Sequence, residues 1–200
     1  MRAFTLGALI LAGGQNRRMG GDPKALLPNG TGARILDGLC LALGIFEEKL
    51  LSTNDPALAA GTDFVPVADA HPGMGPLAGL AAALTVCKSD GLVVAACDMP
   101  CFDRAAAGYL ASFADRGWPA WALRDRTGRL HPLCGVYTKQ CLPAILAALE
   151  ADEHRVGRLF QAVGGQAIPL EGTPLPDTVV CNVNTPEELE ALLAQRQAKT

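Results

Sequence analysis

Apolar residues occur along the first half of the chain in short continuous runs that alternate with longer helical patterns. Four runs predict strands, at residues 5–11, 49–52, 64–67 and 91–96. A continuous apolar run bounded by glycine, such as the first one, is typical of a strand buried on both faces of a sheet. Three stretches predict helices, at residues 33–43, 76–87 and 104–113. The alternation indicates βαβ units around a mostly parallel sheet.

The pattern loosens after Trp118. Residues 120–123 and 130–137 predict two strands joined by a turn at 126–128, and residues 166–170 and 179–181 predict extended segments. Helices are expected at 139–151 and 155–163. A last helix begins after Thr185, which is a good N-cap, with Pro186 in the first helical position and Glu188 completing a capping box. Without repeats or linkers, the chain predicts one domain over residues 1–200, with a Rossmann-like α/β fold.

Composition and charge narrow the class of protein. Half of the 200 residues are hydrophobic and 18% are charged, which excludes a disordered chain. The net charge of -3 argues against binding nucleic acid or anionic membranes by bulk charge. The apolar stretch 8–14 is far shorter than the ~20 residues of a membrane span. Seven scattered cysteines without a CxxC pair favour free thiols over disulfides or structural zinc, so we expect a soluble cytoplasmic protein.

The loop after the first strand concentrates glycines and cations. It reads LAGGQNRRMGGDPK over residues 11–24. Its glycines let backbone N–H groups approach an anion, and Arg17, Arg18 and Lys24 suit a triphosphate. The loop matches neither the P-loop nor the dinucleotide-binding fingerprint GxGxxG. A GxGxx[GA] string does occur later, at residues 73–78, but prolines flank it, and we interpret it as a turn that leads into a helix. The alternative for the loop is a plain glycine turn with solvated arginines.

Polar side chains follow two further apolar segments. Asp98 comes after the strand 91–96, where a lone carboxylate suits a hard cation such as Mg²⁺ that shares its ligands with phosphates. The alternative is a cap for the helix that begins near Asp103, although Asp98 stands five residues ahead of it. Asn182 and Asn184 follow the expected extended segment 179–181 and are two positions apart, so their side chains should point to one face. They bind a polar ligand or hold the turn, and the residue types leave both open.

These motifs together resemble the molybdenum cofactor guanylyltransferase (MobA) family of nucleotidyltransferases. The likeness extends almost from end to end, and its C-terminal string is more particular to MobA than the glycine-rich loop is. The matching strings are Leu11-Ala12-Gly13-Gly14, Arg17-Arg18-Met19-Gly20-Gly21, Gly75-Pro76-Leu77-Ala78-Gly79, Cys97-Asp98, His131-Pro132 and Asn182-Val183-Asn184-Thr185-Pro186-Glu187-Glu188-Leu189.

The resemblance implies a nucleotidyltransferase that transfers GMP from GTP to molybdopterin and releases pyrophosphate, with Mg²⁺ as cofactor. It implies a GTP-binding half at about residues 1–100 and an acceptor-binding half at about 101–200. Catalysis would rest on Arg18, Lys24 and Asp98, with Asp98 as the metal ligand. The nucleotide-binding set is Leu11, Ala12, Gly13, Gly14, Lys24, Asn54, Asp69, Gly75, Gly79 and Asp98; the acceptor-binding set is Asn182, Asn184 and His131.

Some alternatives stay open. His131, beside Pro132, is equally well explained as a packed, half-buried residue. A cytidylyl- or sugar-phosphate nucleotidylyltransferase would keep the chemistry and change the substrates, although the related cytidylyltransferases carry TAAG where this chain has LAGG. A non-catalytic module that binds nucleotide or cofactor is the alternative from another class. We expect a monomer that contacts molybdoenzymes or cofactor-biosynthesis proteins transiently, without nucleic acid or membrane partners.

Overall fold

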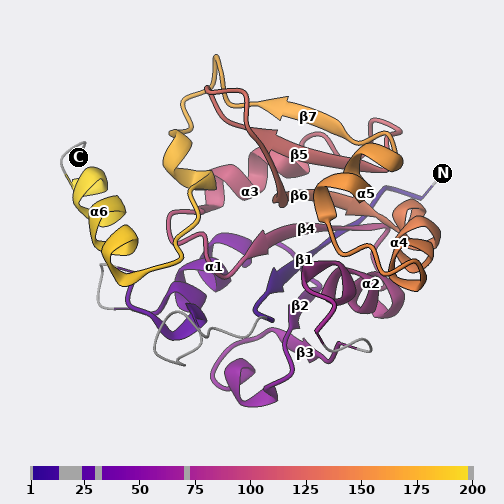
Figure 1. Ribbon diagram of the computed structural model, residues 1–200, viewed down its shortest axis with the longest axis horizontal. Coiled ribbons are helices and arrows are strands. Elements are labelled where there is room, and N and C mark those ends of the chain that lie inside the picture. Colours follow the sequence, from indigo (N-terminus) through magenta and orange to yellow (C-terminus); the bar gives the residue numbers. More distant parts are fainter. Residues whose placement is uncertain (1, 14–23, 30–32, 70–72, 198–200) are drawn as a thin grey trace.

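The computed structural model describes residues 2–13, 24–29, 33–69 and 73–197. Its centre is a seven-stranded sheet with the strand order β3-β2-β1-β4-β6-β5-β7 (Figure 1). β6 pairs antiparallel with β4 and β5, and the other strand pairs are parallel. The strands are β1 (Leu6–Leu11), β2 (Lys49–Ser52), β3 (Val65–Val67), β4 (Gly91–Ala96), β5 (Ala120–Arg124), β6 (Leu130–Thr138) and β7 (Gln166–Pro169).

β1 and β4 form the centre of the sheet and are covered on both faces. Every residue of β4 is buried, and in β1 only Leu6 is partly exposed. Burial on both faces explains why these segments are continuous apolar runs and not alternating ones. Leu11 and Ala96 are register partners, so the loops after β1 and β4 leave the sheet at the same edge.

Helices cover both faces of the sheet (Figure 1). α1, α3 and α6 contribute to the core cluster on one face, and α2, α4 and α5 to the cluster on the other. Among the described helices, none has the length and apolar content that a bilayer crossing needs. The predicted Rossmann-like fold is confirmed. The helices are α1 (Ile35–Leu43), α2 (Pro76–Val86), α3 (Arg104–Ala111), α4 (Leu142–Glu150), α5 (Val156–Ala162) and α6 (Pro186–Gln197).

Two segments differ from the sequence prediction. Residues 179–181 were expected to be extended, but Asp177–Val180 form a turn of 3-10 helix, η4. Val179 and Val180 are both buried in the same core cluster, which suits a helical turn because adjacent residues of a strand point to opposite faces. The expected helix 139–151 is divided into a 3-10 turn, η3 (Lys139–Cys141), and α4, which carries Pro143 in its first turn.

Candidate active site

The carboxyl end of β1 forms one wall of the candidate site. The Ala12 N–H donates to the Ser52 carbonyl at 2.9 Å, and the Cys97 N–H donates to the Leu11 carbonyl at 3.0 Å. These bonds hold the end of β1 between β2 and β4. Gly13 is exposed, and the space that a Cβ would occupy there is open, so the backbone is accessible. Gly14 and Arg18, which were also predicted to bind, lie outside the described residues.

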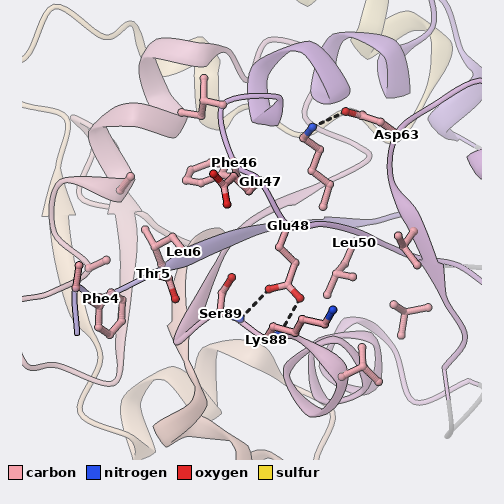
Figure 2. Close-up of a pocket in the computed structure, with 18 of the residues that line it drawn as sticks. Phe4, Thr5, Leu6, Phe46, Glu47, Glu48, Leu50, Asp63, Lys88 and Ser89 are labelled. Atoms are coloured by element: carbon pink, nitrogen blue, oxygen red, sulfur yellow. Dashed lines mark hydrogen bonds and ion pairs between the residues drawn. The ribbon is translucent and has the colours of Figure 1, made fainter. Parts of the chain in front are cut away.

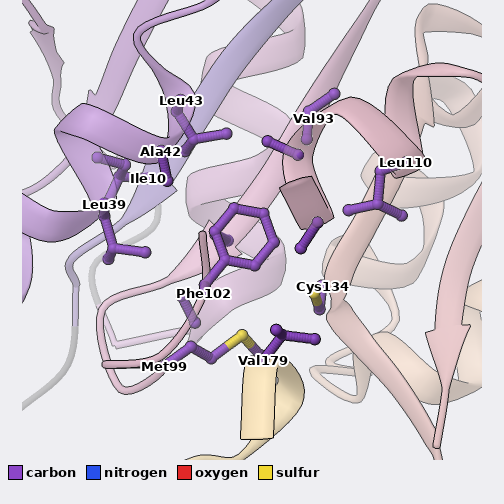
Figure 3. Packing of buried hydrophobic residues seen from close by; sticks show 14 of the residues in the cluster. Ile10, Leu39, Ala42, Leu43, Val93, Met99, Phe102, Leu110, Cys134 and Val179 are labelled. Carbon is purple, nitrogen blue, oxygen red and sulfur yellow. The ribbon is translucent and has the colours of Figure 1, made fainter. Parts of the chain in front are cut away.

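Asp98 stands in the turn after β4, on a rigid support. Met99 and Phe102 follow it into the core, where the Phe102 ring lies among side chains of α1, α3 and β4 (Figure 3). The Asp98 side chain is 20% exposed, and its Oδ1 is buried and accepts no hydrogen bond from any described residue. Asp103 is the cap of α3, since its Oδ1 accepts from the Ala106 N–H at 2.9 Å. Asp98 is therefore not the cap, and one of its oxygens is left without a partner in the described part of the chain.

Lys24 lies between Asp98 and the C-terminal segment, at the start of a short 3-10 helix, η1 (Lys24–Leu26). Its Nζ is 3.8 Å from Oδ2 of Asp98 and donates to Oδ1 of Asn184 at 2.9 Å. Burial raises the pKa of Asp98, and the positive charge of Lys24 acts in the opposite direction. Residues from three separate sequence motifs, 160 positions apart at the extreme, thus meet at one edge of the sheet.

The segment after η4 crosses the end of β4. The Val183 N–H donates to the Asp98 carbonyl at 2.8 Å, and the Val183 side chain is 1% exposed. Asn182 and Asn184 flank it and are exposed, so the expected alternation is present although the preceding turn is helical. The Asn182 side chain also favours the charged form of Asp98 and so lowers its pKa.

The arrangement offers one ammonium group and one carboxylate with an unpartnered oxygen. In the described residues there is no group of three or more His, Cys, Asp or Glu side chains that could hold a metal ion. A single carboxylate fits a hard divalent cation that takes its remaining ligands from phosphates and water. The site therefore suits a metal–phosphate complex better than a bare metal ion.

Comparison with known proteins decides the family. Residues 8–167 match the MobA-like NTP transferase domain. The chain belongs to this family. Molybdenum cofactor guanylyltransferases from Cereibacter sphaeroides (38% identity, 94% of each chain) and Rhodobacter capsulatus (35% identity, 92% of this chain and 93% of the relative) are similar over nearly their whole length. Among solved structures, molybdopterin-guanine dinucleotide biosynthesis protein A from Archaeoglobus fulgidus shares the fold, with a TM-score of 0.81 at 21% identity, covering 97% of this chain and 100% of that one.

Other residues that the MobA resemblance implied lie around the same sheet edge. Asn54 follows β2 and Asp69 follows β3, and the Asp69 N–H donates to Oδ1 of Asn54 at 3.2 Å. Gly75 caps α2 with φ +71°, a conformation that favours glycine. Asn54 and Asp69 follow the carboxyl ends of parallel strands, where open α/β sheets bind ligands. Their nucleotide-binding roles, and that of Gly75, stay predictions.

The surroundings of two further residues of this MobA-like chain bear on their predicted roles. Gly79 is buried against β2: a Cβ there would stand 2.2 Å from Oγ of Ser52, so its lack of a side chain serves helix–sheet packing. Its nucleotide-binding role stays a prediction. His131 is 8% exposed, and its Nε2 lies 2.9 Å from Oδ2 of Asp125 in the β5–β6 turn. Hydrogen bonds from Thr127 and His131 hold the pKa of Asp125 well below its usual range. The packed role of His131 is therefore favoured over contact with an acceptor.

Sequence reasoning missed the part that His154 takes in the MobA-like fold. Its Nδ1 lies 3.2 Å from the Met74 carbonyl, and its Nε2 lies 2.9 Å from Oδ1 of Asp152. Both partners only accept, so both bonds need the doubly protonated ring. The Met74 carbonyl, and after it the Asp152 carboxylate, raise the pKa of His154. His154 thus stabilises the turn before α2 through its hydrogen bond to Met74. The two residues are 80 positions apart, and no local sequence pattern predicts their contact.

A groove of about 1630 Å³ lies away from these residues, at the amino ends of β1, β2 and β4 (Figure 2). Its main polar feature is already satisfied, because the Glu48 carboxylate accepts from the Lys88 and Ser89 N–H groups at 2.7 and 2.8 Å. Ligands of open α/β sheets bind at the opposite, carboxyl edge. We therefore place the candidate active site at the Lys24–Asp98 edge and not in this groove.

Proposed function

We propose that this MobA-like transferase moves the GMP group of GTP to the terminal phosphate of molybdopterin and releases pyrophosphate. The observation that carries the proposal is the contact of Lys24 with both Asp98 and Asn184 at the carboxyl edge of the sheet. It is supported by relatives of 35–38% identity named molybdenum cofactor guanylyltransferase. The acidic chain needs only this local charge to hold a small polyanion.

The reaction requires little covalent chemistry from the protein. An oxygen of the acceptor's terminal phosphate forms a bond to the α-phosphorus of GTP, and the bond from that phosphorus to the α–β bridging oxygen breaks. Because the acceptor is already an anion, the protein has to position the two phosphates and neutralise their charge. In this proposal Lys24 and Arg18 hold the β- and γ-phosphates and stabilise the departing pyrophosphate. Asp98 would hold Mg²⁺, which when bound withdraws charge from the phosphoryl oxygens.

The two halves of the chain would bind the two substrates. On the nucleotide side the proposal uses the backbone of residues 11–13, Asn54, Asp69 and the turn at Gly75. Guanine presents an N1–H and an exocyclic N2–H₂ donor together, and backbone carbonyls and a carboxylate such as Asp69 are suitable acceptors. On the acceptor side it uses residues after 100, with Asn182 as an exposed amide whose side chain interacts with the Asp98 carboxylate.

The proposed setting is the cytoplasm. All seven cysteines are free thiols, as expected in a reducing compartment. We further propose that the protein acts as a monomer and passes its product on in transient contacts with molybdoenzymes or cofactor-biosynthesis proteins.

Pyrophosphate release tests the proposal. The protein is incubated with GTP, Mg²⁺ and molybdopterin, and each component is omitted in turn. We expect release only when all three are present, and an at least 100-fold lower rate for Lys24→Ala. Lys88→Ala is the matched control, because Lys88 is an exposed lysine at the opposite edge of the sheet and should keep the wild-type rate.

The alternative functions give different results in the same assay. Release from CTP, or with a sugar phosphate as the acceptor, would identify a related nucleotidylyltransferase. Tight GTP binding without pyrophosphate release would identify a non-catalytic binding module. Either result overturns the proposal.

A further inference from the structure

Helix α6 begins with an arrangement that differs from an ordinary capping box. The Thr185 hydroxyl accepts from the Glu188 N–H at 3.2 Å, as an N-cap should. The Glu188 carboxylate does not return to the N–H of Thr185. It accepts instead from the N–H of Asn184 at 2.6 Å, one residue before the cap. The carboxylate therefore holds the backbone of a residue whose side chain lies in the candidate active site.

Asn184 is consequently fixed by its neighbours on both sides. Toward the helix its N–H is bound by Glu188, and toward β4 the preceding Val183 is bound to the Asp98 carbonyl at 2.8 Å and buried. With the backbone held in this way, the Asn184 amide oxygen is placed to accept from Nζ of Lys24 at 2.9 Å. A contact chain thus leads from α6 to the only described cation within 4 Å of the Asp98 carboxylate.

We infer that Glu188 is a positioning residue for the nucleotide, acting through Asn184 on Lys24; the inference rests on the proposed use of Lys24 for the phosphates of GTP. A lysine side chain has several rotatable bonds and loses conformational entropy when its ammonium group binds a phosphate. If the ammonium group is already held in place, less of this entropy is lost on binding. Asn184 then serves the nucleotide side of the cleft. This differs from its predicted place on the acceptor side, which is left to Asn182.

Binding of GTP in the presence of Mg²⁺, measured by calorimetry on the full chain, tests this inference without turnover. Glu188→Ala removes the acceptor and is expected to weaken GTP binding about 5- to 10-fold, the scale of one hydrogen bond. Glu188→Gln keeps an acceptor oxygen in the same place and should stay within about 2-fold of the wild type. Glu190→Ala is the matched control, an exposed glutamate of the same helix, and should bind GTP as the wild type does.

Two further measurements separate positioning from simple support of the helix. Asn184→Ala should reproduce the loss seen in Glu188→Ala, and the double variant should be no worse than either one, because both act along one route. In turnover, KM for GTP should rise while KM for molybdopterin changes less than about 2-fold. Unchanged GTP affinity in Glu188→Ala, additive losses, an equal loss in Glu188→Gln, or equal rises in both KM values would overturn the inference.

The failure of this inference is distinguishable from failure of the proposed function. If the wild-type protein binds GTP but releases no pyrophosphate, the proposed reaction is wrong, while the binding series still decides the role of Glu188. If the wild type binds no GTP, both are overturned. If Glu188→Ala lowers only the melting temperature, Glu188 is a structural cap and the inference alone is overturned.

Discussion

Replacing Asp98 by asparagine should abolish activity and at the same time stabilise the fold. The change keeps the shape of the side chain and removes its charge. Burial raises the pKa of Asp98 despite Lys24 at 3.8 Å, so the charged form of this group is less favourable in the folded protein than in the unfolded chain. An unpaired buried polar group costs about 1–3 kcal/mol, and more when it carries a charge. Asparagine leaves a polar atom at the Oδ1 position, so it removes only the part of this cost that belongs to the charge, and it gives up a partly exposed ion pair worth about 0.2–1 kcal/mol. The net gain of Asp98→Asn is therefore about 1 kcal/mol, a rise of about 2–4 °C in melting temperature for a domain of this size.

The pH dependence of this gain has a defined sign. Because the folded-state pKa is raised, wild-type stability associated with Asp98 is fully present below the ordinary aspartate pKa, about 3.9, and is lost as the pH rises through the folded value. The difference in melting temperature between Asp98→Asn and wild type should accordingly be largest near neutral pH and narrow toward pH 4. Thermal unfolding monitored by circular dichroism between about pH 4 and 8 measures it.

Activity and a matched control complete the experiment. With the metal-binding charge gone, the rate of pyrophosphate release should fall at least about 100-fold. Asp103→Ala removes the true cap of α3 and should do the opposite, lowering stability by about 1 kcal/mol while turnover is kept. Near-normal turnover of Asp98→Asn at saturating Mg²⁺, or a lower melting temperature in that variant, would refute the reasoning.

Three other outcomes are expected. Gly79→Ala should lower the melting temperature, because its Cβ meets Ser52 and overpacking costs about 1–3 kcal/mol; weaker GTP binding at unchanged stability would instead support its predicted nucleotide-binding role. The stabilising contacts of His154 with Met74 and Asp152 should be complete below pH 6.5 and lost as the pH rises through the raised pKa, so the melting temperatures of wild type and His154→Ala should converge at alkaline pH; a constant difference argues for packing alone. Excess CTP should compete poorly with GTP in the pyrophosphate assay, and comparable turnover of the two would show a site without guanine selectivity.

Local features of the sequence predicted the architecture well. The bounds of β2 and β4 agree with the apolar runs 49–52 and 91–96, because these strands are buried and carry no competing signal. The antiparallel β6 between β4 and β5 was not predictable, since its place depends on pairing with strands distant in sequence. Residues 179–181 were mistaken for a strand because two adjacent valines suit both a strand and a buried helical turn.

The candidate site was predictable in its members and not in its contacts. Lys24, Asp98 and Asn184 each stood out by residue type, and parallel strands bring the segments after β1 and β4 to one edge. Asn184 follows η4, so strand geometry does not place it. Two hydrogen bonds depend on the backbone register at the start of α6. One runs from Lys24 to the Asn184 side chain, and the other from the Asn184 N–H to the Glu188 carboxylate. Charge and spacing along the chain contain no information of that kind.

The 160 positions between Lys24 and Asn184 also bear on when the site comes into being during synthesis. By the time a ribosome has made the first 100 residues, β1 to β4 and the Asp98 turn are present, but the segment that meets Lys24 is still to come. Closing a loop of that length costs about 1.8 kcal/mol more chain entropy than closing one of about 20 residues. At about 5–20 residues per second, several seconds pass before α6 emerges. A nascent chain of this protein should therefore gain the last part of its nucleotide affinity, about 5- to 10-fold, only after its central sheet has begun to form.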